Sequence, residues 1–261
     1  MTPANRDRDF TGRTLLAVFA HPDDESITCG GLLAACSDGG AFVALLCLTR
    51  GEAGPATATA PAALAATRTT EIGEAATLLG VRDVVVTDHQ DGMLPWTDAA
   101  VVERDIRAAI ARLRPDVVVT FGADGLYWHP DHIAVHERVA AVVSTMADQA
   151  PALYFATMPP GAVRAVFDRA TARARAAGST APRQVLGIAD PDAWGAHAAP
   201  PTLVVDVRAQ ANRKLAALRR HATQLDHDAL SWLTDEDASL LGTEHFHLAG
   251  TRSGFIERLG A

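Results

Sequence analysis

Short runs of apolar residues alternate along the chain with longer, alanine-rich segments whose polar positions recur at helical spacing. The apolar runs are continuous, which is typical of strands that are buried on both faces of a parallel sheet. They predict strands over residues 14–20, 42–49, 83–87, 116–121, 152–157 and 202–207. The segments between them predict helices near residues 27–38, 62–80, 98–113, 131–148, 160–177 and 208–225. This alternation predicts an α/β fold, a Rossmann-like three-layer sandwich with a mostly parallel sheet.

The length of 261 residues fits one large domain, residues 1–261, with a single hydrophobic core. Three segments depart from the alternation of strands and helices. Residues 1–12 are polar and mixed in charge, so we expect a flexible tail. Residues 51–63 are small and proline-rich and suggest a mobile rim, and residues 178–201 suggest a loop or lid insertion before the last strand.

Composition excludes several classes of protein. The net charge is -8 and the arginines are dispersed, which argues against nucleic-acid binding, since phosphate recognition needs clustered basic residues. No apolar stretch approaches the roughly 20 residues of a membrane span, and the N-terminus lacks the apolar core of a signal peptide. The three cysteines form no C-x-x-C motif. We therefore expect a reduced, cytoplasmic protein, and the sequence leaves open whether it forms a homo-oligomer.

Unusual polar clusters follow the first four predicted strands, at the points where those strands end. "AHPDDES" follows the first strand and "GADGLYWHPDH" follows the fourth, with "TRGE" and "DHQDGM" after the second and third. In open α/β sheets, ligands bind at the carboxyl ends of the strands. The sequence therefore predicts a functional site at this edge of the sheet.

The first and last of these clusters have the residue types of a catalytic metal site. Such zinc sites use three protein ligands and leave a fourth position for water. His21 and Asp24 are three positions apart, close enough to reach one ion, and either His129 or His132 could complete the set. A carboxylate left beside the water could act as a general base.

A purely structural interpretation competes with the metal site. Carboxylates favour helix N-termini, so Asp23, Asp24 and Glu25 could cap one helix and Asp131 another. However, two such clusters stand at adjacent strand ends, and like charges packed after a buried strand are costly unless a cation offsets them. These two facts favour the metal site.

Together these motifs resemble the PIG-L/LmbE-like zinc N-deacetylases, a family that includes the N-acetylglucosaminyl deacetylases of mycothiol and bacillithiol synthesis. The paired motifs "AHPDDE" and "HPDH" carry the resemblance. It extends to "TRGEAG", "RTTEIGEAATLLGV", "DGML" and "KLAALRRHATQ". The resemblance implies a zinc-dependent hydrolase that removes an acetyl group from a small amino-sugar conjugate of the N-acetylglucosamine type.

The resemblance also implies a division of roles between neighbouring residues. His21, Asp24 and His132 would bind one Zn²⁺ per chain, and Asp23 would be the general base. Iron(II) suits the same ligands, so the identity of the metal stays open.

Other residues of the second cluster would act on the carbonyl oxygen. His129 would stabilise the oxyanion or act as an acid, Asp131 would hold the His129 ring, and Tyr127 would close on the oxygen. Trp128 departs from the family pattern, in which a glycine is expected. Its bulk would hinder movement of Tyr127 and reshape the pocket.

The resemblance further implies that Glu52, Arg68, Asp91 and His221 contact the substrate. For His221 an equally good interpretation is a histidine near a helix C-terminus, where the helix dipole favours a cation.

Three other functions compete with that of a zinc deacetylase. An amidase of the same family that cleaves a larger acyl group or a thiol conjugate would share these motifs. A dinucleotide-dependent oxidoreductase needs G-x-G-x-x-G after the first strand, where this chain has "HPDDES". A non-catalytic ligand-binding protein would not need Asp23 beside the three presumed ligands.

Overall fold

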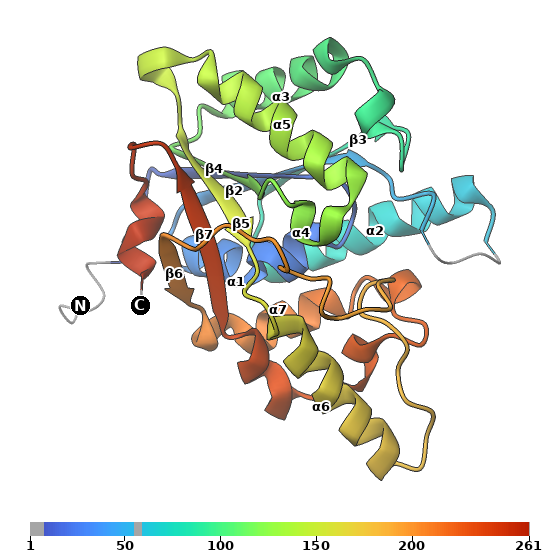
Figure 1. Cartoon of the computed structure of the whole chain (residues 1–261). Coiled ribbons are helices and arrows are strands. Elements are labelled where there is room, and N and C mark those ends of the chain that lie inside the picture. Colours follow the sequence, from blue (N-terminus) through green and yellow to red (C-terminus); the bar gives the residue numbers. More distant parts are fainter. Residues whose placement is uncertain (1–7, 55–58, 261) are drawn as a thin grey trace.

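The strands form one sheet that runs through the middle of the molecule (Figure 1). The computed structural model describes residues 8–54 and 59–260. Within these residues the sheet has seven strands in the order β3-β2-β1-β4-β5-β7-β6. The strands are β1 (Thr14–Phe19), β2 (Phe42–Thr49), β3 (Asp83–His89), β4 (Val117–Phe121), β5 (Ala152–Thr157), β6 (Leu203–Asp206) and β7 (Thr243–Ala249).

Parallel pairing dominates the sheet, as the continuous apolar runs predict. β1 pairs in parallel with β2 and β4, β2 pairs with β3, and β4 pairs with β5. Nearly every residue of β1, β2 and β4 is buried, because the central strands are covered on both faces. The predicted α/β fold with a mostly parallel sheet is confirmed.

The sequence prediction lacks one strand of the sheet. β7 lies between β5 and β6 and runs antiparallel to both. Its sequence, "TEHFHLA", contains no continuous apolar run; Glu244 and Phe246 are buried, whereas His245 and His247 are partly exposed. This alternation is the pattern of an antiparallel strand, and it is too short and too polar to stand out in the sequence.

Helices cover both faces of the sheet (Figure 1). α3 and α5, with the short α4, lie on one face, and α1, α2 and α7 pack together on the other. α6 packs against the 3₁₀ segments between residues 229 and 241. The helices are α1 (Asp24–Asp38), α2 (Pro61–Leu79), α3 (Ala99–Leu113), α4 (Gly125–Trp128), α5 (Pro130–Ser144), α6 (Ala162–Ala176) and α7 (Ala211–Leu218).

Two helices differ from the prediction in ways that affect the site. α1 begins at Asp24 instead of near Ile27, so Asp24 and Glu25 belong to its first turn and Asp23 is its N-cap. The helix expected over 208–225 ends at Leu218, and a short 3₁₀ turn, Ala222–Gln224, follows. The chain leaves the helix here because His221 turns inward and is completely buried against Glu25.

The three irregular segments are only partly as expected. Residues 1–7 and 55–58 lie outside the described residues, so the predicted tail and rim are described only in part. The predicted tail does not extend to Phe10, whose ring is completely buried and packs against Phe255. Residues 178–201 contain no helix or strand, and several of them line the cavity described below. No helix among the described residues is long and apolar enough to cross a membrane.

Candidate active site

The turn between β1 and α1 places three polar side chains at the carboxyl edge of the sheet. His21, Asp23 and Asp24 are each exposed by less than a tenth of their surface. The backbone N–H of His21 donates to Asp24 Oδ2 over 2.7 Å and fixes that carboxylate. Asp23 has a φ of 132°, a conformation that is strained for any residue other than glycine. Backbone strain of this kind concentrates at functional sites.

The three predicted metal ligands meet at one point. His21 Nδ1 lies 3.1 Å from His132 Nε2 and 3.4 Å from Asp24 Oδ2. His132 Nε2 lies 3.2 Å from Asp24 Oδ1. Two ring nitrogens and a carboxylate this close together must share either a proton or a cation, and His and Asp are ligands that zinc prefers.

The far side of each ligand ring is already occupied. His21 Nε2 lies 3.0 Å from Asp91 Oδ1 and 3.2 Å from Asp131 Oδ2, and His132 Nδ1 lies 3.1 Å from the carbonyl oxygen of Gly125. Both acceptors favour the tautomer that places the proton on the outer nitrogen. When both rings are neutral, this tautomer leaves the lone pairs of His21 Nδ1 and His132 Nε2 facing each other, as a metal site requires.

The expectation that Asp131 holds the His129 ring is wrong. The Asp131 carboxylate contacts the His21 ring instead. Asp131 is completely buried and also accepts from the backbone N–H groups of Gly92 and Leu94. The 91–94 segment follows β3, and Asp131 lies in the first turn of α5. These hydrogen bonds therefore connect the loop after β3 to the start of α5. Within the site, the Asp131 carboxylate therefore contacts a presumed ligand and the loop after β3.

His129 lies beside the three presumed ligands with its ring stacked on His132 at a centroid distance of 4.5 Å. Its Nδ1 accepts the backbone N–H of Asp131, so Nε2 carries the proton of the neutral ring. Burial, with the neighbouring His132 and His21 rings, lowers the pKa of His129 to about 4. His129 is thus a neutral hydrogen-bond donor near pH 7. The ring nitrogens of His21, His129 and His132 lie close enough together to hold a metal ion. The same is true of His21 with the carboxylates of Asp91 and Asp131.

Asp23 stands next to this group but points to a different partner. Arg68 Nη2 lies 3.1 Å from Asp23 Oδ2, and the same guanidinium donates to the carbonyl oxygens of Pro22 and Gly51. Burial raises the pKa of Asp23 to about 7, although Arg68 acts in the opposite direction. A carboxylate with this pKa can both take up and release a proton near neutral pH.

A cavity of about 420 Å³ opens over these residues. One side is polar, with His21, Asp23, Asp24, Arg68, Asp91, His129 and Gln224. The other side is apolar, with Tyr127, Leu186, Ile188 and Trp194. Such a cavity, with apolar lining and a few convergent polar groups, is typical of a small-molecule site.

The apolar side depends on a tight turn, Val185–Ile188. Val185 and Ile188 exchange two backbone hydrogen bonds, and Leu186 and Gly187 have φ values of 46° and 81°. The completely buried Asp228 accepts from the N–H groups of Leu186 and Leu230. A leucine in the left-handed region costs about 1 kcal/mol, so the turn relies on this anchor.

Comparison with known proteins points to one family. The family model described as PIG-L: GlcNAc-PI de-N-acetylase matches residues 16–143. A protein of Kineococcus radiotolerans, named as a 1D-myo-inositol 2-acetamido-2-deoxy-alpha-D-glucopyranoside deacetylase, is 36% identical over 87% of this chain and 73% of its own length. The chain belongs to the PIG-L family. A relative of the same name from Geodermatophilus obscurus is 32% identical over 100% of this chain and 99% of its own length. The predicted family and enzyme class, an N-deacetylase, are confirmed.

Solved structures share the fold at low identity. The N,N'-diacetylchitobiose deacetylase of Pyrococcus horikoshii has a TM-score of 0.64 at 20% identity, covering 91% of this chain and 84% of that one. The hydratase GalB of Pseudomonas putida has the same TM-score at 16% identity, covering 92% and 98%. Because a hydratase shares the fold, the fold alone does not select the reaction, and function has to be argued from the site.

The PIG-L resemblance leads one to expect glycine at position 128, and the backbone explains why. Trp128 has a φ of 65° and Leu126 a φ of 66°, a region that glycine enters without strain. The Trp128 side chain is 55% exposed and lies against His197, outside the cavity. Its bulk therefore does not fill the pocket. Tyr127 instead packs on Trp194 at a centroid distance of 4.5 Å.

All four residues expected to contact substrate in this PIG-L protein make other contacts, and two of them do not line the cavity. His221 is completely buried, 2.9 Å from Glu25 Oε1, and does not reach the cavity. Glu52 accepts the backbone N–H of Asp91 and supports that loop from behind. Asp91 does line the cavity, but it also holds His21; Arg68 lines the cavity and pairs with Asp23.

Several cavity residues, four of them with large side chains, were not predicted from the sequence. Gln224 stands in the quoted motif "KLAALRRHATQ", so its position could have been inferred there. Leu186, Ile188 and Trp194 belong to the 178–201 segment, where the composition indicates a loop but not which side chains turn inward.

Proposed function

We propose that this protein removes the acetyl group from an N-acetylglucosamine conjugate by hydrolysing the amide bond. The observation that carries the proposal is the convergence of His21 Nδ1, Asp24 and His132 Nε2 beside the unliganded carboxylate of Asp23. The N-acetylglucosamine–inositol conjugate named for its relatives is the first substrate to test.

The donor set fits a divalent ion, for which we propose Zn²⁺, one per chain. His21, Asp24 and His132 would hold it, with Asp91, Asp131 and the Gly125 carbonyl orienting the two rings. When bound, such an ion supplies Lewis acidity to the amide carbonyl and to a water molecule. Iron(II) suits the same donors, so metal analysis of the purified protein decides between the two ions.

Asp23 would move the proton. Its carboxylate accepts a proton from the attacking water and returns it to the departing amine nitrogen, which must be protonated to leave. Arg68 and the strained backbone hold the carboxylate in place, and burial keeps its pKa near neutrality.

His129 and Tyr127 would act on the developing oxyanion. The Nε2–H of neutral His129 is free to donate, because Nδ1 accepts from the backbone of Asp131. Burial raises the pKa of Tyr127, so its hydroxyl keeps its proton and can also donate. A preorganised donor at this position is worth about 10²–10³ in rate.

The sugar would lie on the polar side of the cavity. Arg68, Asp91 and Gln224 present donors and acceptors there. Glu52 and His221 would support this wall from behind, through Asp91 and Glu25 respectively.

The decisive experiment separates the base from the ligands. Asp23→Ala should retain the metal and lose activity by about 10²–10⁴-fold, whereas His132→Ala should lose both metal and activity. Metal content is measured by mass spectrometry and activity by release of free amine. Asp88→Ala, at an exposed carboxylate outside the cavity, is the matched control. Normal activity in Asp23→Ala would refute this mechanism.

The apolar wall favours a second candidate, an amidase that removes a longer acyl group. Leu186, Ile188 and Trp194 could contact an acyl chain as well as an acetyl methyl. A panel of N-acetyl and N-octanoyl glucosamine conjugates distinguishes the two, since kcat/KM for the octanoyl member would be higher only if the wall binds the chain.

We also propose a reducing, cytoplasmic setting. Cys29, Cys36 and Cys47 are free and buried, and burial raises the pKa of each thiol, so none is set up for disulfide exchange.

A further inference from the structure

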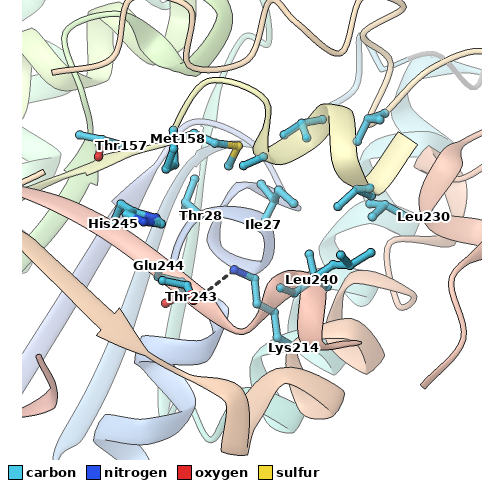
Figure 2. Close-up of a pocket in the computed structure, with 16 residues that line it drawn as sticks. Ile27, Thr28, Thr157, Met158, Lys214, Leu230, Leu240, Thr243, Glu244 and His245 are labelled. Carbon is cyan, nitrogen blue, oxygen red and sulfur yellow. Dashed lines mark hydrogen bonds and ion pairs between the residues drawn. The ribbon is translucent and has the colours of Figure 1, made fainter. Parts of the chain in front are cut away.

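A second cavity, of about 210 Å³, lies apart from the catalytic one (Figure 2). It is enclosed by α1, the end of β5, α6 and the 3₁₀ segment that leads into β7. The two cavities share no lining residue. Most of the lining is aliphatic, including Ile27, Met158, Val163, Val166, Leu230 and Leu241. Mostly apolar cavities with a few polar groups are where proteins bind small molecules.

The two charged residues of this cavity neutralise each other. Lys214 Nζ lies 2.6 Å from Glu244 Oε1, and both side chains are exposed by less than a twentieth. The Glu244 carboxylate also accepts the backbone N–H groups of Gly31 and Leu32, where α1 resumes after its kink at Cys29. A charged group on a ligand would therefore enter an apolar space without a free counter-charge, which is unfavourable.

Polar groups are concentrated at one end of the cavity. Figure 2 shows Thr157, Thr28 and His245 at one side and Leu230 and Leu240 at the other. The Thr28 hydroxyl donates to the carbonyl oxygen of Asp24. The buried Thr157 hydroxyl, in contrast, has no hydrogen-bond partner among the described residues. A buried polar group without a partner is uncommon and calls for one.

Burial, together with the nearby Lys214, lowers the pKa of His245. Its ring is therefore neutral near pH 7, and this end of the cavity offers hydrogen bonds without a net charge.

We infer that this cavity is a second binding site, for a small, neutral, aliphatic molecule that carries one hydroxyl or carbonyl group. The aliphatic part lies among Ile27, Val166 and Leu230, and the polar group bonds with the Thr157 hydroxyl. This site shares no lining residue with the catalytic cavity.

Three probes of equal chain length test the inference: 1-octanol, octanoate and octylamine. Methyl-¹³C-methionine NMR reports the location, because Met158 lines the second cavity whereas Met93 follows Gly92, which lines the catalytic one. We expect octanol to shift the Met158 signal and leave Met93 unchanged, and to bind at least tenfold more tightly than either charged probe. Tighter binding of octanoate or octylamine, or a shift at Met93 alone, would overturn the inference.

Substitutions at exposed positions of α6 test the location of the site without changing the hydrophobic core. Ala162 lines the cavity at an exposed position of α6, and Ala165 is exposed on the same helix but outside the cavity. Ala162→Trp should abolish the octanol-induced shift of Met158, and Ala165→Trp should not. Thr157→Val should weaken octanol binding by about five- to tenfold, as expected for one lost hydrogen bond. Equal binding by Ala162→Trp and Ala165→Trp would mean that octanol binds elsewhere.

Discussion

The two sides of the catalytic cavity are built in different ways. The polar side comes from the regular βαβ part of the chain, in which His21, Asp91 and His132 follow three parallel strands. Most of the apolar side comes from the irregular 178–201 segment, held by the Val185–Ile188 turn and the Asp228 anchor, and Tyr127 of α4 completes it. Parallel strands fix where donor atoms meet, because their carboxyl ends share one edge. A loop wall can change its side chains without moving those atoms.

This difference implies that chemistry and substrate choice can be changed separately. Substitutions on the polar side should affect metal affinity and kcat, whereas substitutions on the apolar wall should affect KM.

The largest effect expected outside the ligands and the base is on metal affinity. Asp131→Asn removes the carboxylate that orients His21, so metal affinity should fall by about 10–100-fold. Competition with a chelator measures it. Asp105→Asn is a matched control, because Asp105 makes a similar contact of 2.9 Å with His89 outside the cavity. If both variants bind metal equally, Asp131 does not orient a ligand.

The pH dependence of kcat/KM comes next. Asp23 must be deprotonated to act as a base, and burial raises its pKa to about 7. Activity should therefore be full above pH 7 and should fall by about tenfold per pH unit below it. Since His129 stays neutral down to a pKa of about 4, it does not limit activity in this range. A profile that is flat between pH 5 and pH 8 would argue against Asp23 as the base.

A smaller effect is expected from the apolar wall. Leu186→Ala should raise KM by about fivefold with little change in kcat, because it removes roughly 1 kcal/mol of apolar contact from ground and transition state alike. Asp228→Asn should act in the same direction by loosening the turn. Leu240→Ala, on an exposed leucine away from this cavity, is the control. If Leu186→Ala changed kcat and left KM unchanged, the apolar wall would contribute to the chemical step and not only to substrate binding.

The smallest effect concerns the position where a glycine is expected. Trp128→Gly relieves a left-handed backbone, so the free energy of unfolding should rise by up to about 1 kcal/mol, with metal affinity unchanged. Trp96→Gly, at an exposed tryptophan whose φ is not positive, should instead be neutral or destabilising. Urea unfolding compares the two. Loss of stability in both variants would show that the Trp128–His197 contact outweighs the strain.

The sequence by itself determined the parallel part of the sheet and pointed to the presumed ligands. The apolar runs of β1, β2 and β4 identify central parallel strands, and the spacing of His21 and Asp24 places both at one turn. These features are local, since each depends on residues that are near one another in the chain. They could therefore be predicted from the pattern together with the family resemblance.

Only the tertiary structure decided which residues support the site. Asp131 contacts His21 across 110 positions of sequence, and His221 contacts Glu25 across 196 positions. No spacing rule connects such pairs, so Asp131 was assigned to its near neighbour His129 and His221 to the substrate. The same applies to Trp194, whose burial against Tyr127 depends on how a segment without helix or strand folds over the sheet edge. Contacts of this kind arise from packing the whole chain, and local pattern carries no information about them.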